Sequence, residues 1–176
     1  MINYLNVNMI VVGYRGYGPS EGFPSEDGIK LDVKAIIKFV LSELKSDINL
    51  ENLYVLGRSL GGACAIYAQA TYPTQIKGLI LENTFLSIED LVDKLFPFLS
   101  YLKNFMLRNK WLSRDLIGKI EDPILFIMSE KDEIVPYEHM TKLYDLAVKS
   151  KNKQKVRLNF ILSIPSQMQL IMMDIF

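Results

Sequence analysis

Gly57-Arg58-Ser59-Leu60-Gly61 is a G-x-S-x-G pentapeptide that joins a run typical of a strand to a run typical of a helix. Residues 52–56 before it are mostly apolar, and residues 62–68 after it are mostly small. A strand that enters a helix through so tight a turn raises the serine hydroxyl above the edge of the sheet. The flanking glycines are expected because a Cβ there would collide with the neighbouring strand or helix, and because positive φ is easy only for glycine. The pattern therefore predicts a serine nucleophile.

The composition is that of one globular domain. With 176 residues, 49% of them hydrophobic, the chain has enough apolar side chains to bury a core. Lysine plus arginine and aspartate plus glutamate number 20 each, which argues against general electrostatic binding of nucleic acid or of an acidic membrane surface. The single cysteine excludes an internal disulfide. No apolar run approaches the roughly 18 residues that cross a bilayer, so we expect no membrane span in these residues.

Strand-like and helix-like segments alternate along the whole chain. Strands are predicted at residues 7–12, 52–56, 78–81 and 124–128, with a fifth candidate at 156–162. Helices are predicted from about 26 to 44, from 62 to 72 and from 136 to 147, whereas residues 84–116 are expected to be irregular or helical. Ser25 is the expected cap of the first helix. This alternation predicts an α/β fold in which helices cover both faces of a parallel sheet.

Several motifs, in a fixed order, resemble the α/β-hydrolase superfamily. They are residues 12–22 (VGYRGYGPSEG), 57–62 (GRSLGG), 82–88 (ENTFLSI), 108–111 (RNKW) and 132–136 (DEIVP). Within the superfamily they are most similar to the serine-aminopeptidase-like group around α/β-hydrolase domain-containing protein 13. The resemblance spans about residues 7–160. It implies the three-layer α/β/α hydrolase fold, with a mainly parallel sheet and catalytic residues in the order serine, acid, histidine.

The resemblance assigns roles to three residues. Ser59 is the nucleophile, and the backbone N–H of Leu60, at the start of a helix, is one donor of the oxyanion hole. The second donor comes in such proteins from a loop after an earlier strand, and nothing in this chain matches that loop. Asp132, after the strand at 124–128, matches the family's acid, although an aspartate before a helix is also common as a turn residue. Glu82, at the end of another strand, is the alternative acid.

The base is the missing member of this set. The family's histidine follows the acid by roughly 30 residues, but residues 160–165 (Phe-Ile-Leu-Ser-Ile-Pro) contain none. His139 is the chain's one histidine, only seven residues after Asp132, within the helix predicted at 136–147. We expect it to be a partly exposed helix residue, and it is the least favoured candidate for the base.

Two further residues, Arg15 and Cys64, are expected to have structural roles. Arg15, in the Gly/Pro loop, could support a substrate, but we favour a brace in which its guanidinium binds loop carbonyls. Cys64 is expected to be a small core residue. No cluster of metal ligands, phosphate-binding loop or dinucleotide fingerprint is present, so we expect no metal and no cofactor.

The resemblance also implies missing parts. In the family another strand, from upstream, separates the strand at 7–12 from the strand before Ser59, so we expect an empty slot in the middle of the sheet. Residues 163–176 do not resemble the family's last strand and helix and form an atypical tail. We therefore predict that residues 1–176 are a single, partial domain without the early strands and the last strand and helix, from an incomplete gene model, a splice product or a fragment.

These observations predict a serine hydrolase that acts on an ester, thioester or amide of a small acyl substrate. Activity is expected to be weak because the histidine and part of the oxyanion hole are absent. The alternative, from a different class, is a non-catalytic hydrolase-like binding module or an incomplete gene product. Relatives are often anchored in membranes through an N-terminal segment that these residues do not contain. The acyl substrate, the compartment and the oligomeric state stay open.

Overall fold

The structure is a computed structural model that describes residues 7–95, 108–129, 132, 134–157 and 169–173. The strands are β1 (Asn8–Val12), β2 (Leu53–Arg58), β3 (Gly78–Glu82), β4 (Ile124–Met128), β5 (Lys153–Arg157) and β6 (Gln169–Met173). The helices are α2 (Glu26–Ser42), the short η1 (Leu50–Asn52), α3 (Leu60–Thr71), α4 (Ile88–Leu95), α6 (Ser113–Ile117) and α7 (Tyr137–Leu146). The predicted parallel sheet with helices packed against it is confirmed. The helices α2, α3, α6 and α7 join one core on one face of the sheet, and among the described residues no helix packs against the apolar cluster on the other face, so the predicted helical cover of both faces is not seen there. The fifth strand begins three residues before its predicted start, and residues 158–162 lie outside the described residues.

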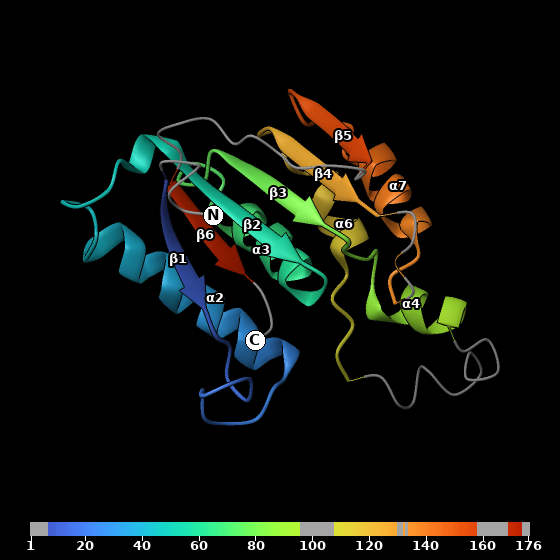
Figure 1. Cartoon of the computed structure of the whole chain (residues 1–176), viewed down its shortest axis with the longest axis horizontal. Helices are drawn as coiled ribbons and strands as arrows, with labels where there is room; N and C mark the ends of the chain where they lie inside the picture. The colour runs from blue at the N-terminus through green and yellow to red at the C-terminus, as the bar shows by residue number, and fades with distance from the viewer. Residues whose placement is uncertain (1–6, 96–107, 130–131, 133, 158–168, 174–176) are drawn as a thin grey trace.

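All six strands form one parallel sheet in the order β1-β6-β2-β3-β4-β5 (Figure 1). The expectation of an empty slot between β1 and β2 is wrong, because β6 lies there and pairs with both strands. Asn8 and Leu53 both pair with Gln169, and Val12 and Gly57 both pair with Met173. The tail that was not expected to form the family's last strand thus supplies a central strand, which satisfies backbone groups that would otherwise cost about 1–3 kcal/mol each when buried unpaired.

Alternate residues of the central strands divide between two apolar clusters. Leu53 and Val55 of β2, with the corresponding residues of β3 and β4, join the main core beneath α2, α3, α6 and α7. Tyr54 and Leu56 face the other way and pack around a smaller cluster of Val7, Ile80 and Ile127. The residues of β2 that face the main core are buried, whereas Tyr54 and Leu56 on the opposite face are only partly buried.

The N-terminus of α2 fixes a segment that lies far away in the sequence. Ser25 caps the helix as predicted, with its Oγ accepting a hydrogen bond from the Gly28 N–H at 3.1 Å. The carboxylate of Glu26 accepts from the N–H groups of Lys110 and Trp111, at 2.5 and 3.0 Å, and pairs with Lys30 at 2.6 Å. The Trp111 side chain is buried in the main core. The RNKW motif is therefore a structural anchor held by one carboxylate.

Glu26→Ala is expected to lower the free energy of unfolding by about 3 kcal/mol, because it removes two hydrogen bonds to a charged acceptor and leaves the part-buried Trp111 N–H without its acceptor. Asp27→Ala, at the neighbouring exposed acid of the same helical turn, is the matched control and is expected to cost about 0.5 kcal/mol. Urea denaturation followed by circular dichroism measures both. Equal losses in the two variants would mean that Glu26 acts only through the helix dipole.

The same contact predicts a dependence on pH. Burial alone would raise the pKa of Glu26, but the hydrogen bonds from Lys30, Trp111 and Lys110 outweigh it and hold the pKa below its ordinary value. Glu26 therefore contributes its full stabilisation above the pKa that its carboxyl has in the unfolded chain, about 4.3. This stabilisation is lost as the pH falls through the lower pKa that Glu26 has in the folded chain. The stability difference between the wild type and Glu26→Gln should narrow over this acidic range.

Candidate active site

The turn at Ser59 has the strained geometry that the pentapeptide predicts. β2 ends at Arg58 and α3 begins at Leu60, so that Ser59 alone makes the connection, with φ of 50° and ψ of −118°. A non-glycine residue in such a region costs of the order of 1–3 kcal/mol and persists only where its surroundings impose it. The surroundings here are hydrogen bonds at the backbone of Ser59. Its N–H donates to the Glu82 carbonyl at 3.0 Å, and its carbonyl accepts from Thr84 Oγ1 at 2.7 Å.

Close packing of glycines allows the turn. A Cβ on Gly57 would lie 2.2 Å from the carbonyl oxygen of Gly61, and a Cβ on Gly62 would lie 2.4 Å from the Cβ of Thr84. The predicted collision at Gly57 is confirmed, whereas that at Gly61 stays a prediction. Ser59 itself is partly exposed, and its side chain makes no capping hydrogen bond to α3. The N–H of Leu60 is at the first position of this helix, where backbone donors lack intrahelical partners.

Asp132 lies at the same edge of the sheet as Ser59. β2, β3 and β4 are parallel neighbours, so the segments that follow them emerge side by side at their C-terminal ends. Asp132 Oδ1 accepts from the N–H groups of Ile134 and Val135, at 2.9 and 2.8 Å, just before α7. The structure thus shows the turn role of this aspartate. Its role as the catalytic acid stays a prediction.

His139 is part of a contact between α7 and the loop after β3. Its side chain is only 5% exposed, so the expectation of a partly exposed residue is wrong. The reason is that His139 Nδ1 accepts from the Leu86 N–H at 3.3 Å, and the neighbouring Met140 Sδ accepts from the Thr84 N–H at 3.2 Å. His139 lines a cavity of about 280 Å³ with residues of α4 and α7, and Ser59 is not among the lining residues.

Glu82, the alternative acid, is bound into the elbow through its backbone. Its carbonyl accepts the Ser59 N–H, while its carboxylate is partly exposed and lies 3.8 Å from Arg58 Nε in a loose ion pair. Cys64 is a fully buried core residue, as predicted. Burial raises the pKa of the Cys64 thiol to about 12, so it is not ionised near neutral pH and is no alternative nucleophile.

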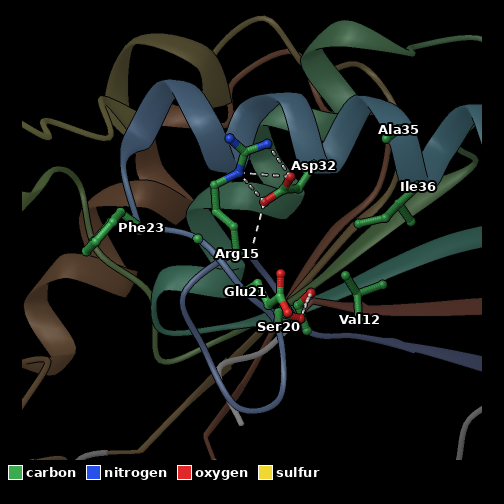
Figure 2. Close-up of a pocket in the computed structure, with 10 residues that line it drawn as sticks. Val12, Arg15, Ser20, Glu21, Phe23, Asp32, Ala35 and Ile36 are labelled. Carbon is green, nitrogen blue, oxygen red and sulfur yellow. Dashed lines mark hydrogen bonds and ion pairs between the residues drawn. The ribbon is translucent and has the colours of Figure 1, made fainter.

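Arg15 braces its loop through a carboxylate rather than through loop carbonyls, which corrects the predicted partner. Figure 2 shows its side chain against Asp32 of α2. Arg15 Nε lies 3.0 Å from each Asp32 oxygen, one terminal nitrogen lies 2.7 Å from Oδ1, and the Arg15 N–H donates to Oδ2 at 3.1 Å. Burial alone would raise the pKa of Asp32, but these bonds hold it below its ordinary value. An open cavity of about 620 Å³ lies beside the pair, between the Gly/Pro loop and α2.

Sequence reasoning missed Asp32, although a signal was present. Asp32 follows Ile29 by three residues and precedes Ile36 by four, so it is a carboxylate on the apolar side of its helix. Such a residue is expected to have a partner. Among the described residues, no group of histidine, cysteine and acidic side chains could hold a metal ion, and no helix is long and apolar enough to cross a membrane.

Comparisons with known proteins agree with this geometry. A family model described as "alpha/beta hydrolase fold" matches residues 7–110. The chain is 40% identical over 155 residues to alpha/beta hydrolase domain-containing protein WAV2 of Arabidopsis thaliana, covering 82% of this chain and 50% of that protein. It is 31% identical over 177 residues to lysophosphatidylserine lipase ABHD12 of Danio rerio, covering 92% of this chain and 45% of the lipase. The chain thus spans about half the length of the curated relatives it matches.

Solved structures share the same architecture. An alpha-beta hydrolase from Vibrio vulnificus superposes with a TM-score of 0.67 at 21% identity, covering 87% of this chain and 56% of that one. At this identity the likeness concerns the fold alone. The finer likeness to the serine-aminopeptidase-like group stays a prediction.

Proposed function

Since this chain belongs to the α/β-hydrolase family, we propose that it contains the nucleophile of a serine hydrolase that acts on esters, thioesters or amides. The observation that carries the proposal is the positive φ of Ser59 at a one-residue strand-to-helix turn. This strain has no purpose in a plain connection, whereas it is the geometry that exposes a nucleophilic hydroxyl. The chain covers only about half the length of its relatives. The hydrolase activity of a whole protein is therefore proposed here as well.

Each named residue has one step in the reaction. Ser59 Oγ attacks the acyl carbon while a base removes its proton, and the Leu60 N–H stabilises the negative charge on the carbonyl oxygen. The leaving group departs with a proton, and water then releases the acyl group from the serine. Asp132 orients the base and stabilises its charged form. The relative named as a lysophosphatidylserine lipase supports a lysophospholipid ester as the first substrate class to test.

The rate is expected to be low for the 176-residue chain. Residues 160–165 contain no histidine at the place where the family has one, and His139 Nδ1 is occupied by the Leu86 N–H. Loss of a triad member lowers kcat by about 10⁴–10⁶. A reactive phosphonate probe is therefore a better test than turnover, since it needs one attack and no deacylation.

A fluorophosphonate probe is expected to label the wild-type chain slowly and covalently, with Ser59 Oγ displacing fluoride. Ser59→Ala should abolish labelling, and Ser46→Ala, at an exposed turn serine that bonds to Asp47, should not. In-gel fluorescence measures the rates, and circular dichroism confirms that each variant is folded. Labelling that persists in folded Ser59→Ala would refute Ser59 as the nucleophile.

Two substitutions at His139 distinguish a role in positioning a loop from a role as the catalytic base. We propose that it positions the loop after β3, so His139→Asn, whose amide oxygen can still accept the Leu86 N–H, should keep the labelling rate. His139→Ala should lower stability by about 1–3 kcal/mol, since a buried donor loses its acceptor. If both variants fold and both lose labelling more than about a hundredfold, His139 is the base instead.

The second candidate function is a non-catalytic binding module. The specific observation in its favour concerns His139, the one histidine of the chain, whose Nδ1 accepts the Leu86 N–H in the loop after β3. In that case a folded sample shows no labelling with the probe at any time or pH. The same experiment thus distinguishes the two functions.

A further inference from the structure

β6 alone connects β1 to the rest of the sheet. Within the described residues, β1 pairs only with β6, and β2 pairs with β6 on one side and β3 on the other. Five register pairs join β6 to β1 and five join it to β2. Without β6, two apolar strands would present unpaired backbone edges to each other, which is a template for any extended chain of matching length.

The recognition in this slot is carried by the backbone. The β6 sequence, Gln-Leu-Ile-Met-Met, has no charged residue, and neither does the β1 sequence, Asn-Met-Ile-Val-Val. The β2 residues in register with β6, Leu53–Gly57, are uncharged as well. The tail of a second copy has the same sequence as the chain's own tail, so it presents the same groups to the slot. The same hydrogen-bond ladders form in either case.

The geometry of the connection permits both arrangements. β5 and β6 are separated by β4, β3 and β2, a lateral distance of about 19 Å at 4.8 Å per strand spacing. The chain must also return along a strand of about 17 Å, because β5 and β6 are parallel, so the span is about 26 Å. Residues 158–168 can extend to about 40 Å. The connection reaches its own slot with length to spare, and the same reach allows the strand to enter a neighbour.

We propose that the slot between β1 and β2 accepts the β6 strand of a second copy of this chain, so that the tails exchange and a dimer forms. The exchanged strand completes the active-site scaffold of its partner copy, because Met173 pairs with Gly57, two residues before Ser59. The ladder contacts are identical in both forms, so concentration sets the balance. A tethered segment has an effective concentration in the millimolar range, which a second copy must approach to compete.

Disulfide trapping in the full chain tests the exchange. In a Cys64→Ala background, which removes the one native thiol, Val55→Cys and Ile171→Cys lie opposite each other in register. Neighbouring strands lie about 4.8 Å apart, within the range of Cα separations that a disulfide spans. Both substitutions in one chain should give an intramolecular disulfide at low concentration. Two chains with one substitution each, mixed unfolded and refolded together, should give a cross-linked dimer on a non-reducing gel.

The dimer fraction is expected to rise more than about tenfold when the refolding concentration is raised from about 5 μM to about 500 μM. Leu79→Cys is the matched control, since Leu79 pairs with Val55 but lies one strand farther from β6, beyond the reach of a disulfide. Leu79→Cys mixed with Ile171→Cys should give no specific dimer. Equal dimer with this control, or monomer alone at every concentration with the matched pair, would overturn the proposal.

A second measurement avoids substitutions in the chain. The wild type is refolded with an excess of a fluorescent peptide that copies residues 166–176, and incorporation is read by gel filtration. The peptide should co-elute with the protein, whereas the same peptide with Ile171→Pro should not, because proline cannot complete a central ladder. Equal uptake of both peptides, or uptake of neither, would also overturn the proposal.

Discussion

Gly57→Ala is expected to lower the free energy of unfolding by more than about 4 kcal/mol, a large fraction of the roughly 5–15 kcal/mol that stabilises a native domain. The added Cβ would lie 2.2 Å from the carbonyl oxygen of Gly61 and 2.7 Å from the N of Gly62. These are backbone atoms in the first turn of α3, so no side-chain rotation relieves the contact. The helix must move away from β2, and this movement breaks the turn that holds Ser59. Urea denaturation and phosphonate labelling measure the two effects.

Gly13→Ala is the matched control for this prediction. Its added Cβ would meet only Ser20 Oγ at 3.3 Å, a side-chain atom of a partly exposed residue that need shift by only a few tenths of an ångström. We expect a loss below about 1 kcal/mol and an unchanged labelling rate. A Gly57→Ala variant as stable as Gly13→Ala would show that the helix does not start as close to the strand as the structure has it.

Ile171→Pro is expected to destabilise the chain by about 3 kcal/mol or more. β6 is paired on both sides, so the lost N–H removes a ladder bond wherever it points, and the proline ring pushes against a neighbouring strand. The loss extends to β1, whose described pairing depends on β6 alone. Thermal or urea unfolding, together with amide hydrogen exchange in β1, measures the effect.

Lys155→Pro separates this effect from a general intolerance of proline in the sheet. β5 is an edge strand, and the Ile124 N–H donates to the Asn152 carbonyl, so the N–H of Lys155 points away from β4 by the alternation of a parallel ladder. We expect a loss below about 1 kcal/mol in this variant. A similar small loss for Ile171→Pro would contradict the central position of β6.

The parts of the fold that the sequence predicts are those set by local interactions. The strand at 124–128 and the Ser25 cap are confirmed, because the apolar run and the capping hydroxyl act within a few residues. The turn at Ser59 is predicted from one pentapeptide, which contains both the steric exclusion at Gly57 and the strand-to-helix change, although hydrogen bonds to the distant Glu82 and Thr84 also hold it. The nucleophilic role built on that geometry is a separate statement, which the labelling experiment tests.

The parts that the sequence did not predict depend on partners far along the chain. Glu26 contacts residues 110–111, and His139 contacts Leu86, and neither spacing has a local signature. The tail strand is the clearest example. Gln169–Met173 is short, uncharged and apolar, which is consistent with a strand, but its place between β1 and β2 follows from an opening that only the assembled sheet presents.

The position of β6 also sets the order of assembly during folding. Pairing of Asn8 with Gln169 joins nearly opposite ends of the 176-residue chain, whereas β2 meets β3 after a single intervening helix. Contacts between residues so distant in sequence form slowly, because the chain loses the entropy of closing a long loop before any favourable contact forms. The β2–β5 half of the sheet is therefore the natural nucleus, and the first strand of the chain is among the last to be secured. Until then, newly synthesised chains expose the unpaired edges of β1 and β2. A high protein concentration at this stage favours association between chains over the folding of single chains.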